Sequence, residues 1–289
     1  MKSGTIAIIG QPNTGKSTLL NKLIGEPVAI VTPKPQTTRT RIIGILNRPE
    51  GQAVFIDTPG YHSIPRPMHQ FMLNEIETTI DACDLFCFLV DPNSREPEID
   101  DELMERLRKF SPFVIVNKAD TLRPAQRDHI AKELHDRWGM KELFFISALT
   151  GDGVEELTQA FFNILPEGPP HYDEELYTEM PIRFLAAEAI REQAMMLLHQ
   201  EVPYSLAVCV RTFEEKPQIT VIQADIIVER ETHKAMVIGK NGQMIKKIGT
   251  RSREKIEHFM NGKVFLELFV KVEPNWTTSG EKLKEYGYA

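Results

Sequence analysis

Cysteine is scarce in this chain of 289 residues, and its three cysteines, Cys83, Cys87 and Cys209, show no spacing typical of metal ligands. So small and odd a number excludes a disulfide framework and argues against a zinc site. We therefore expect three reduced thiols in the core of a cytosolic protein.

Long apolar runs are missing as well. No stretch approaches the ~20 apolar residues that a membrane-spanning helix needs, which argues against an integral membrane protein. The first residues lead directly into an apolar run that we expect to form a strand, so we expect no signal peptide. Hydrophobic residues make up 42% and charged residues 26% of the chain, which is ordinary for a globular protein of about two domains.

The net charge of −7 is unevenly distributed along the chain. Residues 1–175 carry 18 Lys/Arg and 26 Asp/Glu, whereas residues 176–289 carry 16 and 15. Between Arg230 and Lys255 there are eight basic and only two acidic residues, a net charge of +6. Such a cluster favours a polyanionic partner, although a solvated helix face is the usual explanation of a charge run taken alone.

One motif with the pattern G-x-x-x-x-G-K-S predicts a phosphate-binding loop. It comprises Gly10, Gln11, Pro12, Asn13, Thr14, Gly15, Lys16 and Ser17, and Thr18 follows it. An apolar run precedes the motif and a helix-like stretch follows it, which is the context that a P-loop needs. Loop N–H groups and the helix N-terminus favour an anion there. We expect Lys16 to reach the β- and γ-phosphates of a nucleotide and Ser17 to bind Mg²⁺.

Short apolar runs alternate with helix-length stretches over the first 165 residues. We expect strands at residues 5–9, 42–46, 53–56, 85–90, 113–116 and 143–146, and helices at residues 16–24, 68–82, 100–110, 124–138 and 154–165. The alternation predicts βαβ units, a mostly parallel sheet and an α/β fold. Ligands of such sheets bind beyond the carboxyl ends of the strands, and the informative motifs fall there.

The first of these motifs, Asp57-Thr58-Pro59-Gly60, follows the third expected strand. Asp57 is suited to hold Mg²⁺ through water, and the Gly60 N–H is suited to approach a γ-phosphate. The alternative is a simple strand-end turn, because Pro-Gly is a common turn pair. The P-loop upstream favours the binding role.

Two more strand ends carry Asn117-Lys118-Ala119-Asp120 and Ser147-Ala148-Leu149. Asp120 can accept two hydrogen bonds from guanine, whereas adenine has neither donor and would leave the carboxylate unpaired. We expect Asn117 to brace the loop, the Lys118 stem to cover the base and the Ala148 N–H to donate to guanine O6. Either motif alone is weak, but both in this order after a P-loop indicate a guanine nucleotide.

With these motifs in place, the whole chain resembles the Era family, which are translation-factor-class GTPases. The letters Gly-x-Pro-Asn-x-Gly-Lys-Ser match that family's P-loop, and residues 32–39, TPKPQTTR, resemble its switch I. The resemblance implies a Ras-like P-loop GTPase domain that hydrolyses GTP to GDP and phosphate with Mg²⁺. The residues that it implies in catalysis are Asn13, Lys16, Thr38 and Gly60. It implies Ser17, Thr38 and Asp57 as metal ligands, with Thr37 as the alternative to Thr38.

One residue departs from the Ras pattern. Ras-like enzymes carry a glutamine just after the D-x-x-G motif to orient the attacking water, and here that position is Tyr61. Related GTPases with asparagine at the position of Asn13 use a bound K⁺ beside the phosphates, and the resemblance extends this arrangement to the present chain. The alternative is that Asn13 only shapes the loop. We expect slow intrinsic hydrolysis unless another group supplies charge.

The chain changes character after residue 165, where a Pro- and Gly-rich stretch is followed by acidic residues. We expect a GTPase domain at 1–167, a linker at 168–181 and a second domain at 182–289 that ends in a C-terminal tail. The second domain is expected to place helices at 182–198, 233–238 and 244–260, and strands at 205–211, 218–229 and 264–272.

The loop Gly239-Lys240-Asn241-Gly242 joins two of these helices inside the basic cluster. A G-x-x-G loop in this position is the element with which KH domains clamp a single-stranded backbone. In the order αββααβ, the segment resembles a type II KH domain, a small α+β fold, as Era proteins have. We expect an apolar groove beside the loop, lined by Val237, Ile238 and Ile245. The residues expected to contact RNA are Val237, Ile238, Gly239, Lys240, Asn241, Gly242, Ile245, Lys246 and Lys247.

The resemblance implies that the RNA is single-stranded, the 3′ end of 16S ribosomal RNA, and that the protein assists assembly of the small ribosomal subunit. It further implies a cytoplasmic monomer with at most peripheral contact with the inner face of the cell membrane. Two alternatives remain at this point: an RNA-binding adaptor with a degenerate nucleotide domain, and a P-loop kinase or ATPase. Intact Lys16 and Asp57 argue against the first, and Asp120 argues against the second.

Overall fold

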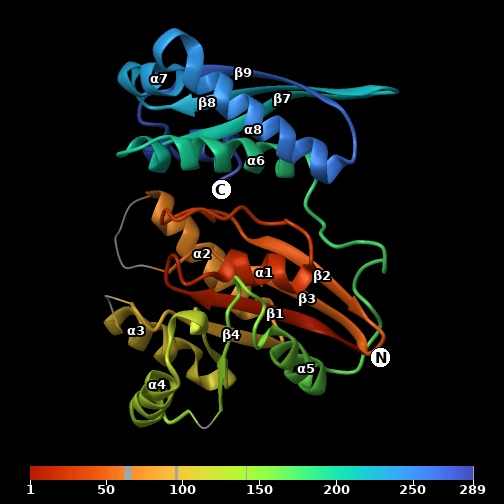
Figure 1. Ribbon diagram of the computed structural model, residues 1–289, viewed down its shortest axis with the longest axis vertical. Coiled ribbons are helices and arrows are strands. Elements are labelled where there is room, and N and C mark those ends of the chain that lie inside the picture. The colour runs from red at the N-terminus through yellow and green to blue at the C-terminus, as the bar shows by residue number, and fades with distance from the viewer. Residues whose placement is uncertain (62–66, 95–96, 141, 289) are drawn as a thin grey trace. The chain divides into compact units, whose positions relative to one another are not determined.

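The computed structural model describes residues 1–61, 67–94, 97–140 and 142–288 (Figure 1). The chain forms two compact units. The first comprises residues 1–29, 38–65 and 72–179, and the second comprises residues 30–37, 66–71 and 180–289. The short segment 30–37 therefore belongs with the second unit, although its neighbours on both sides along the chain belong with the first.

A six-stranded sheet in the order β2-β3-β1-β4-β5-β6 forms the centre of the first unit. Its strands are β1 (Lys2–Gly10), β2 (Ile42–Arg48), β3 (Gly51–Asp57), β4 (Leu85–Val90), β5 (Phe113–Val116) and β6 (Leu143–Phe145). All neighbouring pairs are parallel except the β2–β3 hairpin. The predicted α/β fold with a mostly parallel sheet is confirmed, and the carboxyl ends of β1, β3, β4, β5 and β6 meet at one edge.

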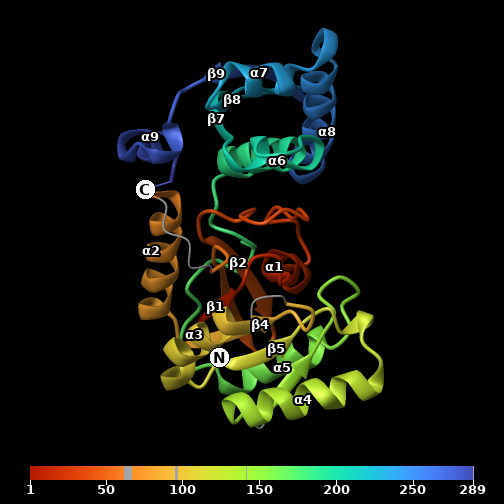
Figure 2. The same cartoon turned by 90° about the vertical axis from the view of Figure 1, so that its left-hand side faces the viewer.

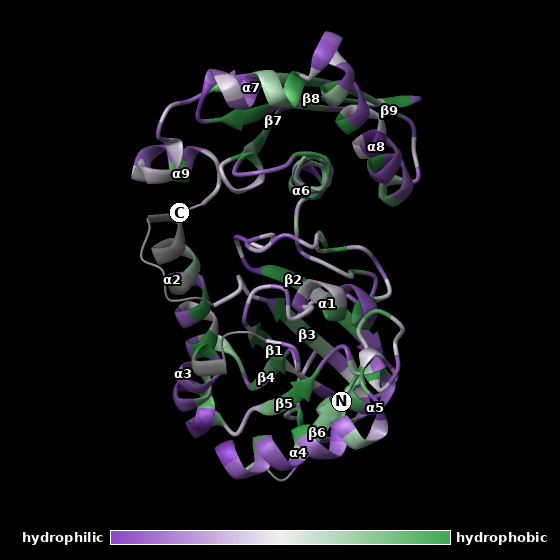
Figure 3. Ribbon diagram, turned by 60° about the vertical axis from the view of Figure 1, so that its left-hand side comes forward, coloured by the Kyte–Doolittle hydropathy of each residue, from purple (hydrophilic) through white to green (hydrophobic). Residues whose placement is uncertain are grey.

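Helices cover both faces of this sheet (Figure 2). They are α1 (Lys16–Ile24), α2 (Pro67–Ala82), α3 (Pro97–Leu107), α4 (Pro124–Trp138) and α5 (Val154–Ile164). Ala7 and Ile9 of β1 share a core with α2, α3 and α4, whereas Phe55 of β3 meets Phe161 of α5 edge to face on the other side. Because both faces are covered, the central parts of the strands are apolar, and much of the sheet is green in Figure 3.

The segment after α5 covers the edge strand β2. The Ile45 N–H donates to the Tyr177 carbonyl at 2.9 Å, and the Thr178 hydroxyl donates to the Ile43 carbonyl at 2.5 Å. An uncovered edge strand would expose unpaired backbone groups, which favour aggregation. Most of the segment expected to be a linker therefore packs as part of the first unit, up to Glu179.

The second unit has the element order αββααβ. Its elements are α6 (Ile182–Leu197), β7 (Ala207–Lys216), β8 (Ile219–Val228), α7 (Glu231–Ile238), α8 (Gln243–Met260) and β9 (Val264–Val272). The strands pair in the order β7-β8-β9, antiparallel first and parallel second. This is the predicted type II KH topology. β7 continues to Lys216 beyond the expected end at Arg211, because its polar half pairs with β8 past a bulge between Val210 and Thr212.

The predicted C-terminal tail is ordered around Trp276. Trp276 is fully buried and its indole N–H donates to the Ser205 carbonyl at 3.0 Å. A short helix follows, α9 (Gly280–Glu285), whose Leu283 is also buried. Its N-cap is Ser279, whose hydroxyl accepts the Lys282 N–H at 3.4 Å. Sequence reasoning missed this helix, because six residues are too few to show a helical period.

The three thiols differ in their surroundings. Cys87 lies fully buried in β4, where burial raises its pKa, as expected of a core thiol. Cys83 and Cys209 are free as well but only partly buried. Cys83 packs against the core shared with α2 and α3, so the prediction that all three lie in the core is wrong only for Cys209. Among the described residues, no helix is long and apolar enough to cross a lipid bilayer.

Candidate functional site

The predicted phosphate loop connects β1 to α1 at the carboxyl edge of the sheet. Gly15 caps α1 with φ of 99°, and a Cβ there would lie 2.2 Å from Asn117 Nδ2. Asn13 takes the left-handed conformation with φ of 64°, and its side chain is exposed. The loop thus needs glycine at position 15, and its N–H groups come together with those of the first turn of α1.

Lys16 is buried beneath this loop. Its Nζ donates to the carbonyls of Gly10 at 3.1 Å and Gln11 at 2.8 Å. Burial lowers the pKa of Lys16 to about 8, although the charge of Asp57 opposes this. A desolvated ammonium held by neutral carbonyls gains strongly from an added anion, so Lys16 is suited to bind phosphate.

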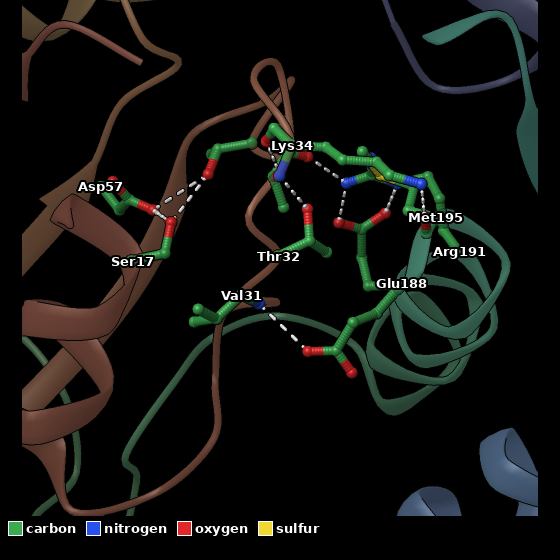
Figure 4. Close-up of polar contacts among 11 residues, drawn as sticks. Ser17, Val31, Thr32, Lys34, Asp57, Glu188, Arg191 and Met195 are labelled. Atoms are coloured by element: carbon green, nitrogen blue, oxygen red, sulfur yellow. Dashed lines mark hydrogen bonds and ion pairs between the residues drawn. The ribbon is translucent and has the colours of Figure 1, made fainter. Parts of the chain in front are cut away.

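The three predicted metal ligands lie together. The Ser17 hydroxyl donates to Asp57 Oδ2 at 2.6 Å and lies 2.8 Å from Thr38 Oγ1, which itself lies 3.3 Å from Asp57 Oδ2 (Figure 4). Thr37 is engaged elsewhere, because its hydroxyl bonds with the Lys34 carbonyl and the Thr32 hydroxyl, each at 2.7 Å. The structure therefore favours Thr38 over Thr37 as the ligand.

These oxygens fit Mg²⁺. Asp57 is completely buried, and within the described part of the chain its Oδ1 atom has no hydrogen-bond partner. Burial raises the pKa of Asp57 to about 6, although Lys16 and Ser17 oppose this. A buried carboxylate with a free oxygen beside two hydroxyls offers the hard oxygen ligands that Mg²⁺ prefers, with the remaining positions left to water and phosphate.

The D-x-x-G motif packs directly on the phosphate loop. The Thr58 hydroxyl donates to the Ile8 carbonyl at 2.9 Å, and a Cβ on Gly60 would come within 2.7 Å of the Pro12 backbone. Glycine at position 60 therefore allows close packing on the phosphate loop, and the approach of its N–H to a γ-phosphate stays a prediction.

Tyr61 does not replace the missing glutamine. Its ring is buried in the core shared with α3, and its hydroxyl donates to Glu102 Oε1 at 2.5 Å. Burial and this bond raise the pKa of Tyr61 to about 12. A side chain turned into the core is not available to orient a water molecule at the phosphates.

The predicted base site is organised by Asn117. Its Nδ2 atom donates to the Thr14 carbonyl at 2.7 Å, and its Oδ1 atom accepts the Ala148 N–H at 2.9 Å. Asn117 thus braces the loop as expected. The Ala148 N–H, however, was expected to serve guanine O6, and here it serves Asn117, so base recognition through it requires that this bond be shared or exchanged.

The other predicted base contacts lie around this amide. Asp120 is exposed in a turn after β5, whereas Ser147 is buried and its hydroxyl accepts the Thr150 N–H at 3.2 Å. Leu149 is 78% exposed. The Asp120 carboxylate is therefore accessible to a ligand, while Ser147 supports the loop.

Sequence reasoning missed Asp91. It follows β4, and its carboxylate accepts a bond from Lys118 Nζ at 2.5 Å, which holds the stem expected to cover the base. The signal was available, because β4 lies between β1 and β5, and polar residues at the carboxyl ends of central strands belong to the site.

The G-x-x-G loop of the second unit is shaped by its glycines. Gly239 has φ of 71°, and a Cβ there would meet Met244 at 2.6 Å. Gly242 with φ of 73° begins α8, and Asn241 between them is also left-handed. Lys240 and Asn241 are exposed, so the loop presents backbone N–H groups, a cation and the N-terminus of α8 to one side.

A groove runs beside this loop between α8 and β9. Its lining combines apolar and basic residues: Ile245, Lys246, Gly249, Thr250, Arg253, Leu266, Glu267 and Leu268. The predicted Ile245 and Lys246 are among them, and Lys247 is exposed on the same helix. Val237 was predicted to line the groove, and this is wrong: it is fully buried in the core, because it lies on the inner face of α7.

Comparisons with known proteins agree with the division of the chain into a nucleotide-binding unit and a KH unit. A family model described as 50S ribosome-binding GTPase matches residues 5–118, and one described as KH domain matches residues 201–277. GTPase Era from Geobacter sp. (strain M21) is 44% identical, covering 99% of this chain and 98% of the relative. GTPase Era from Syntrophus aciditrophicus (strain SB) is 43% identical, covering 99% and 95%.

Two solved structures are similar over the full length. Era in complex with MgGDPNP and nucleotides 1506–1542 of 16S ribosomal RNA has a TM-score of 0.96 at 38% identity, covering 100% of this chain and 99% of that one. A single-residue variant of Aquifex aeolicus Era bound to GDP·AlF₄⁻ has a TM-score of 0.94 at 38% identity, covering 100% of each.

The base site yields the first prediction. Asp120→Asn replaces two acceptors by one donor and one acceptor, so it should weaken GTP binding by on the order of several kcal/mol and favour XTP, whose C2 oxygen can receive a bond. Affinities of both nucleotides measured by competition test this. Asp136→Asn, an exposed change on α4, is the matched control. Unchanged GTP affinity in the Asp120 variant would remove this residue from the base site.

Proposed function

Because the chain belongs to the Era family of GTPases, we propose that it is a GTP-driven switch that binds the 3′ end of 16S ribosomal RNA and assists assembly of the small ribosomal subunit. The GTPase activity follows from the family. The RNA target is supported by the similar Era structure in complex with nucleotides 1506–1542 of 16S ribosomal RNA. The observation that carries the proposal is a complete phosphate loop and a complete G-x-x-G loop in one chain.

The nucleotide would be held from both ends. We assign the phosphates to the N–H groups of residues 10–18 and to Lys16, and the base to Asp120 with Lys118 and Asn117 around it. Ser17, Thr38 and Asp57 would hold Mg²⁺, which neutralises charge on the β- and γ-phosphates when bound. The convergence of these three side chains, with a free Asp57 oxygen, supports this assignment.

Without a glutamine to orient the attacking water, hydrolysis then needs another group that supplies positive charge at the phosphates. Tyr61 is buried against Glu102, which leaves the loop residue Asn13 and a bound K⁺ as the proposed source. The exposed, left-handed Asn13 is compatible with this role and also with shaping the loop alone. A comparison of GTP hydrolysis in K⁺ and in Na⁺ distinguishes these two roles of Asn13.

RNA would be bound at the loop and along the groove. The backbone phosphates fit against Lys240, the loop N–H groups and the start of α8, and the bases fit the apolar part of the groove around Ile245. Lys246 and Lys247 add positive charge on the same helix. Exposure of these cations at a glycine-shaped loop supports binding over the simpler reading of a solvated helix face.

We place this activity in the cytoplasm, with the protein acting as a monomer and touching the inner face of the cell membrane at most peripherally. The support is the family resemblance together with three free thiols.

The two activities are expected to depend on each other. Segments of the switch I type order when Mg²⁺ and γ-phosphate are both present. Segment 30–37, directly before Thr38, packs with the KH unit. We therefore propose that GTP raises RNA affinity relative to GDP.

Replacing K⁺ by Na⁺ at equal concentration should slow GTP hydrolysis well beyond any general salt effect if a bound K⁺ acts beside Asn13. Asn13→Ala should remove the difference between the two salts. Phosphate release measured in both salts for both proteins tests this. Equal rates for the unaltered protein would leave an external activator as the source of the missing charge.

Lys240→Asp with Asn241→Asp puts two carboxylates where RNA phosphates should lie. Single-strand RNA affinity should fall by at least about tenfold and become less salt-dependent, while GTP affinity stays unchanged. Lys284→Asp with Asn275→Asp, the same changes at two exposed positions of the C-terminal segment, is the matched control. Normal RNA binding by the loop variant would identify the basic cluster as a solvated face.

RNA affinity should be higher with a non-hydrolysable GTP analogue than with GDP by about 1–3 kcal/mol, the usual size of allosteric coupling. Linkage requires RNA to tighten binding of the analogue by the same factor. Titrations with the analogue, with GDP and without nucleotide, at one salt concentration, measure this. Three equal affinities would mean two independent modules, even if both activities were real.

A further inference from the structure

The segment 30–37 is bound to one helix of the KH unit, α6. The Val31 N–H donates to Glu192 Oε1 at 3.0 Å, and Lys34 Nζ donates to the carbonyls of Met195 and Leu198 (Figure 4). Met195 lies in the last turn of α6 and Leu198 is its C-cap, where helix acceptors lack intrahelical partners and the dipole favours a cation. Near the other end of the segment, the Thr37 carbonyl accepts a bond from Arg191 at 2.6 Å.

Arg191 is an unusual residue to find in this place. It is 1% exposed and pairs with Glu188 through two bonds, of 2.7 Å to Oε1 and 2.5 Å to Oε2. Burying such a pair costs several kcal/mol in desolvation, and an apolar pair of the same size would often be at least as stable. Stability alone therefore does not explain it. The planar guanidinium binds both carboxylate oxygens of Glu188 and the Thr37 carbonyl in one fixed geometry, and the single ammonium of a lysine does not reproduce this bidentate arrangement.

The bond to Thr37 acts on the next residue. The Thr37 carbonyl and the Thr38 N–H belong to one planar peptide group, so fixing the carbonyl oxygen also restricts the orientation of the Thr38 backbone N–H. Thr38 Oγ1 in turn lies 2.8 Å from Ser17 Oγ, in the set of oxygens assigned to Mg²⁺. One peptide bond therefore separates the acceptor of Arg191 from a proposed metal ligand.

A second contact joins the same helix to the RNA-binding elements. Glu192 accepts the Val31 N–H with one carboxylate oxygen and Lys255 Nζ of α8 with the other, at 2.5 Å. Helix α8 starts at the G-x-x-G loop and carries Lys246 and Lys247. Adjacent residues of α6 thus touch the segment before Thr38 and the helix behind the loop.

We propose that Arg191 is a positioning residue for GTP-dependent metal binding: it holds the 37–38 peptide so that Thr38 faces the metal site, and it makes α6 the element that links nucleotide state to the KH unit. This inference rests on the proposed role of Thr38. Mg²⁺ contributes to binding of GDP and of GTP, but Thr38 adds its oxygen only when γ-phosphate orders the segment. Loss of Arg191 should therefore affect the GTP state alone.

The test is the Mg²⁺ dependence of binding of fluorescent GDPNP and fluorescent GDP to the full chain. In Arg191→Met, the Mg²⁺ concentration at half-maximal GDPNP affinity should rise by about tenfold, as for loss of a hydrogen bond from a charged donor, while the GDP curve stays in place. Arg191→Lys, which keeps the charge beside Glu188, should give a smaller shift. Arg183→Met is the matched control, since Arg183 lies on α6 and donates to the Val210 and Arg211 carbonyls.

Thr38→Ala in the same assay tests the role of Thr38 at the metal site separately from the positioning role of Arg191. If it leaves the GDPNP curve unmoved, the proposed metal site is wrong. If it shifts the curve while both Arg191 variants leave it in place, or shift GDP equally, the positioning role is wrong and the metal site stands. Should Arg191→Met fail to fold, Arg191→Lys decides by the same criterion, because a purely structural arginine would not distinguish GDPNP from GDP.

Discussion

The nucleotide site depends on one buried amide. Asn117 donates to the Thr14 carbonyl in the phosphate loop and accepts the Ala148 N–H in the loop after β6, so it ties the phosphate loop to the loop that we propose to face the base. It is 2% exposed, and removing it would leave a buried carbonyl and a buried N–H unpaired, at a cost of about 1–3 kcal/mol each. The same amide requires glycine at position 15, because any Cβ there would collide with it.

Around this amide the parallel sheet supplies the rest. β1 leads into the phosphate loop, β3 ends at Asp57, and β4 ends beside Asp91, which holds Lys118. Because these strands are neighbours and run in the same direction, residues far apart in the sequence meet at one edge. At the position where Ras-like enzymes carry the water-orienting glutamine, this chain has Tyr61, whose ring is turned into the core. Catalysis by this protein is therefore expected to depend on charge recruited from outside the side chains of the D-x-x-G motif.

The KH unit uses the same physical device for a different polyanion. A glycine-shaped loop again precedes a helix N-terminus, and cations stand on the first turns of that helix. Its groove differs from the nucleotide site in being partly apolar, which suits bases rather than a second phosphate group. Segment 30–37, which directly precedes Thr38, is bonded to α6 of the KH unit through Val31 and Thr37.

Much of this could be predicted from the residues alone. The glycine-rich motifs, the polar residues after apolar strands and the αββααβ order are local patterns, and their chemistry does not depend on distant contacts. The strand β4 and the helix α1 have the bounds predicted from the sequence. The engagement of the Thr37 hydroxyl away from Ser17, the burial of Val237, the engagement of the Ala148 N–H and the helix around Leu283 were decided by tertiary structure. Each depends on which partner a side chain or backbone group finds across the fold, and adjacent threonines or a single helical valine have no local property that reveals that partner.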